Sequence, residues 1–79
     1  MTDDDIYPKL ATIFDDVFEY DGPLAADTVA ADVDGWDSVG HIRLVLAAED
    51  AFGVRFDPKE VVGLNNLGEL VAAIRQKAG

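Results

Sequence analysis

Residues 34–53, which read DGWDSVGHIRLVLAAEDAFG, constrain the fold more than any other part of the chain. An Asp-Gly turn pair opens the stretch, and apolar residues then recur at helical spacing until Gly53. We therefore predict a helix over residues 38–52, with Gly53 as a left-handed cap. Ser38 would lie at its N-terminus, where backbone N–H groups lack partners within the helix. The apolar positions of this helix are Val39, Ile42, Leu44, Val45, Leu46 and Phe52.

The first apolar block also has helical spacing. We expect a helix over residues 6–18 that ends at the turn-forming residues 21–23, Asp-Gly-Pro. Pro8 should lie in its first turn, because a proline inside a helix removes a hydrogen bond and clashes with the preceding turn. Residues 24–37 then form a connection that is long for packed helices. We expect its apolar residues to contact the core one at a time: Leu24, Val29, Val33 and Trp36. Trp36 could either form a wall of the site or pack the loop onto the core, and we favour packing because one aromatic residue among helices usually packs.

Capping signals mark the remaining helices. Residues 57–60, Asp-Pro-Lys-Glu, predict the start of a helix that Gly63 limits to one or two turns. Residues 66–77 repeat the capping pattern and carry the last helix. No segment has the pattern of a credible strand. We predict an all-α fold, a small four-helix bundle with three longer helices, one short helix and a long first loop, as a single domain over residues 1–79.

Composition and charge narrow the classes of function. The chain has 16 acidic and 6 basic residues, and its net charge is −10. An acidic surface repels phosphate groups, so we expect no nucleic-acid partner and no binding to anionic membranes. No apolar run could span a bilayer and no secretory signal is visible, so we expect a cytoplasmic monomer. The absence of cysteine excludes disulfides, a thiolate nucleophile and a Cys-type zinc site.

The spacing of Asp32, Asp34 and Asp37 suggests a calcium-binding loop, but the other ligand positions of such a loop are not filled by suitable residues. If Asp32 took the first ligand position, Trp36 and Arg43 would fall at positions that require oxygen ligands. We therefore predict no metal site.

A catalytic trio is suggested by Ser38, His41 and Asp37, which imitate a nucleophile, a base and an acid. We predict no catalysis, because no further group orients the imidazole, no oxyanion loop is recognisable, and the domain is too small for a cleft that excludes water. His41 is expected to be a surface contact near Ser38.

Residues 35–39, GWDSV, and the helix exit at residues 49–53, EDAFG, resemble the acyl carrier proteins and the related peptidyl and aminoacyl carrier domains. Length, acidic charge and helix order extend the resemblance over nearly the whole chain. It implies that Ser38 carries 4′-phosphopantetheine, transferred from coenzyme A by a phosphopantetheinyl transferase with Mg²⁺. It also implies that Asp37 helps the transferase and its metal to engage.

The resemblance implies a carrier protein, not an enzyme. The arm's thiol would hold an acyl or aminoacyl group as a thioester for enzymes of fatty-acid, polyketide or specialised metabolism. Its partners would include a loading ligase or synthetase and downstream transfer enzymes. Gly40 and Arg43 replace acidic docking residues of many fatty-acid carriers, which favours a specialised pathway. The predicted contact face comprises Val39, His41, Ile42, Arg43, Glu49 and Asp50.

Two alternatives stay open at this point. In the first, the chain is an unmodified acidic helical module that binds a basic partner, and Ser38 is only a helix cap. In the second, the chain is a small hydrolase, and the only support for this hypothesis is the proximity of Ser38 and His41. The mass of the native protein would distinguish a modified carrier from an unmodified module.

Overall fold

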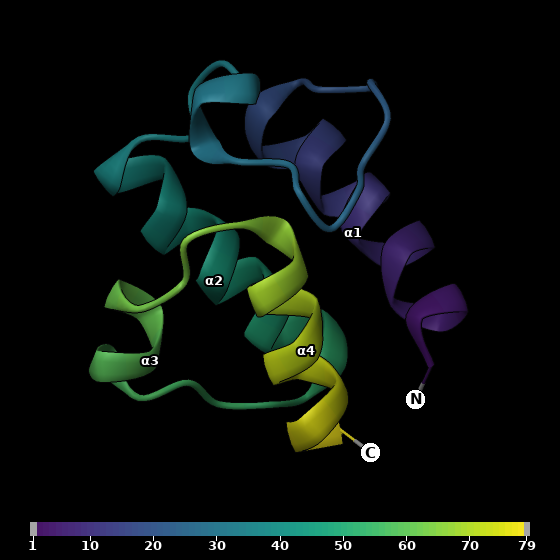
Figure 1. Cartoon of the computed structure of the whole chain (residues 1–79), viewed down its shortest axis with the longest axis vertical. Helices are drawn as coiled ribbons and strands as arrows, with labels where there is room; N and C mark the ends of the chain where they lie inside the picture. The colour runs from purple at the N-terminus through teal and green to yellow at the C-terminus, as the bar shows by residue number, and fades with distance from the viewer. Residues whose placement is uncertain (1, 79) are drawn as a thin grey trace.

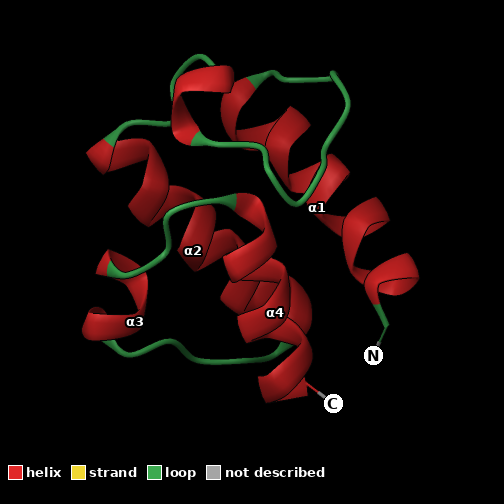
Figure 2. Ribbon diagram, in the orientation of Figure 1, coloured by secondary structure: helices red, strands yellow, loops and turns green. Residues whose placement is uncertain are grey.

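Three helices enclose one apolar core, and a short fourth helix lies at the edge of the molecule (Figure 1). The computed structural model describes residues 2–78, and within that range it contains helices and loops but no strand (Figure 2). The helices are α1 (Asp3–Phe18), α2 (Ser38–Phe52), α3 (Pro58–Val62) and α4 (Leu67–Ala78). The predicted all-α fold, with three longer helices and a short one, is confirmed. The bounds of α2 are those that its spacing and caps predict.

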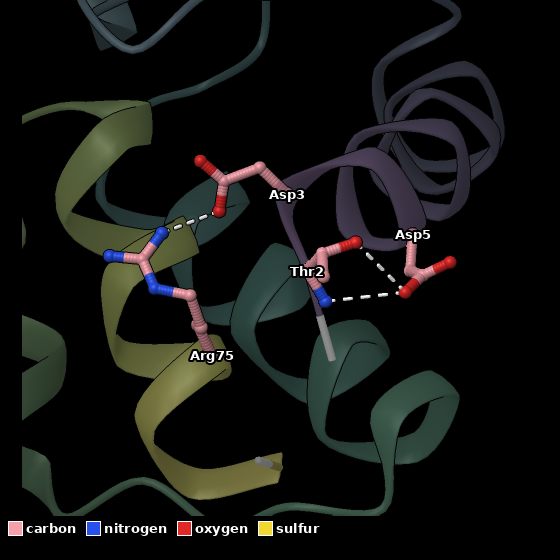
Figure 3. A network of polar contacts seen from close by, with 4 residues as sticks. All are labelled: Thr2, Asp3, Asp5 and Arg75. Atoms are coloured by element: carbon pink, nitrogen blue, oxygen red, sulfur yellow. Dashed lines mark hydrogen bonds and ion pairs between the residues drawn. The ribbon is translucent and has the colours of Figure 1, made fainter.

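The start of α1 lies three residues before the predicted one. The Asp5 carboxylate accepts hydrogen bonds from the N–H and the hydroxyl of Thr2, at 3.2 and 3.0 Å, and this pair stabilises the first turn (Figure 3). Pro8 therefore lies in the second turn, and the prediction that it lies in the first is wrong. Proline has no N–H to donate to the carbonyl of Asp4, but Asp4 is exposed, so water can bond that carbonyl.

The end of α1 at Phe18 is as predicted, but the residue that ends it is different. Glu19 adopts a left-handed conformation with φ of 54°, and its N–H donates to the carbonyl of Asp15 at 2.9 Å. The helix thus stops before the Asp-Gly-Pro turn at residues 21–23. A non-glycine residue in this conformation costs about 1–2 kcal/mol, so the sequence contains no signal for it.

The core lies between α1, α2, α4 and the long first loop. Its buried residues are Ile6, Leu10, Ile13, Phe14, Val33, Trp36, Leu44, Ala48, Leu67, Leu70, Val71 and Ile74. Val33 and Trp36 come from the loop, as predicted, and Leu24 packs half-buried against the core. The prediction is wrong for Val29, which is 36% exposed. Val29 directly precedes a 3₁₀ turn over Ala30–Asp32, which the spacing does not indicate.

The long loop is attached to the N-terminus of α4. The N–H groups of Leu67 and Gly68 donate to the carbonyls of Thr28 and Ala26, at 2.8 and 2.9 Å. The Asn66 side chain caps the next N–H of the helix at 2.9 Å, as predicted. These bonds satisfy backbone donors that would otherwise lack partners, and they hold the loop in place without a regular element of its own.

α3 is held mainly by polar contacts, since none of its residues is buried. The predicted cap is present: the Glu60 carboxylate accepts the N–H of Asp57 at 3.1 Å. The same carboxylate pairs with Lys77 of α4 at 2.9 Å. A second ion pair, between Arg75 and Asp3, joins α4 to α1 (Figure 3).

Candidate functional site

Ser38 is the first residue of α2, and its side chain is exposed. The residue before it, Asp37, caps the helix: its Oδ1 accepts the N–H of Gly40 at 2.8 Å, and its carbonyl accepts the N–H of His41 at 2.7 Å. The cap fixes the turn that presents the Ser38 hydroxyl. Because the remaining first amides lack acceptors within the helix and the dipole is positive there, an anionic group on Ser38 would be stabilised.

Gly40 allows the loop before Ser38 to lie directly against α2. A side chain on Gly40 would overlap the carbonyl oxygen of Gly35 and would approach the Phe18 ring within 2.9 Å. Gly40 is buried, so it is a packing position of α2 rather than a docking position. The lack of an acidic residue there therefore has a structural reason that does not depend on the pathway.

Trp36 joins this loop to the core. Its ring lies edge-on to Phe14, with centroids 5.4 Å apart, and stacks against Phe18 at 6.3 Å. It is 7% exposed, which confirms the predicted packing role, and it is also one of the residues that line a groove beside Ser38.

His41 lies one turn after Ser38, and both of its ring nitrogens have partners within the protein. Nδ1 accepts the indole N–H of Trp36 at 3.0 Å, and Nε2 lies 2.9 Å from the carbonyl oxygen of Val61. Because an indole nitrogen can only donate, Nδ1 carries the lone pair and Nε2 donates to Val61. The expectation that nothing orients the imidazole is therefore wrong, but the two partners orient it away from proton transfer with Ser38. Partner contact by His41 stays a prediction.

The acidic residues near the site bond backbone amides. Asp32 accepts the N–H of Val29 at 3.1 Å, and Glu49 accepts the N–H of Phe56 at 2.8 Å. Within residues 2–78, no group of three or more His, Asp or Glu side chains is arranged to hold a metal ion.

A groove of about 750 Å³ begins beside Ser38 and runs between α2 and α3. Its lining on α2 extends from Ser38 to Glu49, which corresponds to about 16 Å of helix. Most of the lining is apolar. The lining residues are Ala30, Trp36, Asp37, Ser38, His41, Ile42, Val45, Leu46, Glu49, Phe56, Pro58, Val61, Val62, Leu64 and Asn65.

The apolar residues of α2 are divided between two faces. Leu44 and Ala48 are fully buried in the core, whereas Val39, Ile42 and Leu46 are 67, 55 and 58% exposed. Helical spacing could not show this division, because both sets of residues are apolar. The exposed set gives α2 an apolar stripe next to Ser38.

The remaining residues of the predicted contact face differ in exposure. Arg43 and Asp50 are exposed, whereas His41 and Glu49 are half-buried and hydrogen-bonded within the chain. The sequence did not indicate the lining from α3. The sequence feature that could have indicated this lining is the pair Val61 and Val62. The helix is too short to bury two adjacent apolar residues.

Comparison with known families distinguishes between the alternatives. A family model described as the phosphopantetheine attachment site matches residues 8–74. The chain belongs to the acyl carrier protein family. It is 34% identical to a holo acyl carrier protein from Geobacter metallireducens whose solution NMR structure superposes with a TM-score of 0.79, over 89% of this chain and 82% of that one. Comparison with curated proteins gave no significant match.

Membership confirms the predicted resemblance and the covalently attached phosphopantetheine cofactor. The start of α2 fits such a group, because an exposed hydroxyl stands at a capped helix N-terminus beside an apolar groove. None of the described helices of this carrier protein combines the length and apolar character that crossing a membrane requires.

Proposed function

We propose that this carrier protein holds an acyl group as a thioester on 4′-phosphopantetheine attached to Ser38, and that it delivers this group to partner enzymes. The observation that carries the proposal is the exposed Ser38 hydroxyl, which stands at the capped N-terminus of a 15-residue helix and opens onto the apolar groove. The cofactor supplies the flexible arm and the thiol, which a chain without cysteine lacks. The chain itself acts as a carrier and not as an enzyme.

Asp37 has two roles in this proposal. Its Oδ1 caps α2 through Gly40, which fixes the position of Ser38. Its second carboxylate oxygen is available to engage the Mg²⁺ that a phosphopantetheinyl transferase brings to the reaction. One side chain thus supports both the presentation of the hydroxyl and its modification.

The lining of the groove favours an uncharged acyl cargo over an aminoacyl one. Placing an ammonium group among Ile42, Leu46 and Val62 would require desolvation without a compensating partner. Glu49, the acidic residue at the far end of the α2 lining, already accepts the N–H of Phe56. The apolar groove therefore suits a fatty or polyketide-type acyl chain.

Loading and transfer enzymes would contact the exposed face of α2. Val39 and Ile42 supply its apolar part, and Arg43 and Asp50 supply charges of both signs. This mixed face supports partners from a specialised acyl pathway. We place the protein in the cytoplasm as a monomer, where a reducing environment keeps the arm's thiol free.

The proposal is tested by incubating the protein with coenzyme A, Mg²⁺ and a promiscuous phosphopantetheinyl transferase. Intact mass should increase by one phosphopantetheine, and Ser38→Ala should abolish the increase, since Ser38 is the only serine in the chain. Thr12→Ala removes another exposed helical hydroxyl and should leave the increase unchanged. An increase that survives Ser38→Ala, or none in the wild type, would contradict the proposal.

The mass of the protein isolated from its host, with thioesters preserved, identifies the cargo. A native protein that always lacks the arm would instead favour the unmodified module, whose expected partner carries a basic surface.

A further inference from the structure

His41 connects three parts of the fold: α2, to which it belongs, the loop before Ser38, and α3. From α2 it accepts the indole N–H of Trp36, in the loop before Ser38, and it donates to the carbonyl of Val61, in the last turn of α3. The Trp36 and His41 rings are also nearly parallel, at an interplanar angle of 13° with centroids 6.2 Å apart. We call these two hydrogen bonds the His41 bridge. The neutral imidazole has one N–H donor and one acceptor nitrogen, and these two hydrogen bonds use both.

α3 depends on such contacts more than the other helices do. It has only five residues, none of them buried, so apolar packing by the helix itself contributes little to its position. Its polar contacts are the Glu60–Lys77 ion pair, which is partly exposed, and the bond from His41 to Val61. An exposed ion pair contributes little and allows movement, whereas the His41 bond is half-buried and directional.

The bond between His41 and Val61 also joins the two walls of the groove. Both residues line it, one from α2 and the other from α3, and Ser38 lies one turn away on the same lining. The bond is therefore placed to limit the distance between the two walls near Ser38. If the bond opened, α3 could move away while α1, α2 and α4 kept their shared core.

We propose that His41 is a positioning residue that holds α3 against α2 and thereby keeps the groove formed around the cargo. Trp36 also contributes, because its indole N–H donates to Nδ1 of His41 and so fixes the tautomer in which Nε2 carries the proton. The hydrogen bonds stand independently of the proposed function, whereas the consequence for the cargo rests on it.

The two halves of the bridge can be separated by two substitutions. His41→Asn places an amide oxygen near the position of Nδ1, so it keeps the acceptor for Trp36 but loses the donor to Val61. His41→Gln places an amide nitrogen near the position of Nε2, so it keeps the donor but loses the acceptor. Each variant serves as the matched control for the other.

The first experiment uses the unmodified protein and measures amide hydrogen exchange and the indole N–H resonance by NMR. In His41→Asn, exchange at the hydrogen-bonded amides of Val61 and Gly63 should become roughly 2- to 10-fold faster, which corresponds to one net hydrogen bond. The amides of α1 should not change. In His41→Gln the α3 amides should keep their rates, and the resonance of Trp36, the only tryptophan, should shift.

Equal exchange at α3 in the wild type and in His41→Asn would overturn the proposal, as would faster exchange of similar size in all helices. The same effect in both variants would also overturn it, since it would show that only the packing of the ring matters. If either variant failed to fold, Glu60→Gln, which removes the other contact of α3, would replace it: the His41 bond predicts that the α3 amides of Glu60→Gln remain protected.

The second experiment attaches a solvatochromic pantetheine analogue to Ser38. Emission of the dye should shift to longer wavelength in His41→Asn but not in His41→Gln, because the displaced α3 would expose the dye to water. Unchanged emission in all three proteins would overturn the link to the cargo. A protein that gains no mass would contradict the attachment at Ser38 instead, while the exchange experiment would still decide the His41 bridge.

Discussion

Gly40→Ala tests how closely the loop before Ser38 packs on α2. At an exposed helical position this change would stabilise the helix by about 1 kcal/mol, because alanine has the higher helix propensity. Here the added Cβ would overlap the carbonyl oxygen of Gly35 and lie 2.9 Å from the Phe18 ring. The phenyl ring could shift, but a backbone carbonyl cannot rotate away without moving the loop.

The expected magnitude follows from these two opposing effects. Overpacking a tight site costs about 1–3 kcal/mol, and a rigid backbone contact places this site near the upper limit. After subtraction of the propensity gain, the net loss in the free energy of unfolding should be about 2 kcal/mol. For a domain of this size, that loss corresponds to a melting temperature lower by about 8–16 °C.

The assay is urea denaturation followed by circular dichroism, with Gly63→Ala as the control. Gly63 has a φ of −81°, and the nearest atom to its added Cβ would be 3.4 Å away, which is ordinary contact. The control should change the free energy of unfolding by no more than about 0.5 kcal/mol. Gly40→Ala should also slow modification by the transferase, because the displaced loop carries Asp37. If Gly40→Ala were as stable as Gly63→Ala, the close approach described above would be refuted.

Three further predictions follow from burial, charge and capping. Phe14→Ala should lower the free energy of unfolding by about 3–5 kcal/mol, because Phe14 is fully buried, whereas Val62→Ala, at a side chain 83% exposed, should have an effect below about 0.5 kcal/mol; equal losses in urea denaturation would contradict the core. The hydrogen bond from Lys77, together with a backbone N–H, lowers the pKa of Glu60, so its stabilisation is present above the unfolded pKa and is lost as the pH falls through the lowered folded pKa. The stability difference between the wild type and Glu60→Gln should therefore vanish on acidification, and a difference that does not depend on pH would show that the pairing contributes nothing. Asp37→Asn should keep the helix cap, while Asp37→Ala should lose about 1 kcal/mol, and both should slow the transferase because both lack the carboxylate; a wild-type rate of mass gain in Asp37→Asn would refute its role in modification.

Local signals determined the bounds of α2, the starts of α3 and α4, and the place of Ser38 at the head of α2. α2 begins after a capping aspartate and ends at a glycine with φ of 66°, so its bounds follow from residues that are neighbours in the sequence. The starts of α3 and α4 follow from capping residues in the same way. Ser38 belongs to this local group, because the motif that identifies it surrounds it directly.

Contacts between distant residues decided the rest. Which apolar residues of α2 face the core depends on where α1 and α4 pack, and Val39 and Leu44 are equally apolar in the sequence. The bond between His41 and Val61 joins residues 20 positions apart, and no spacing rule predicts it. The groove lies between α2 and α3, so it forms only when α3 has packed beside α2, where the bond from His41 joins the two helices. The sequence by itself thus determined the bounds of α2, the starts of α3 and α4, and which hydroxyl stands at the head of α2, since those depend on local backbone hydrogen bonding. The tertiary structure alone decided what lies beside that hydroxyl, since burial depends on segments that meet only after the chain has folded.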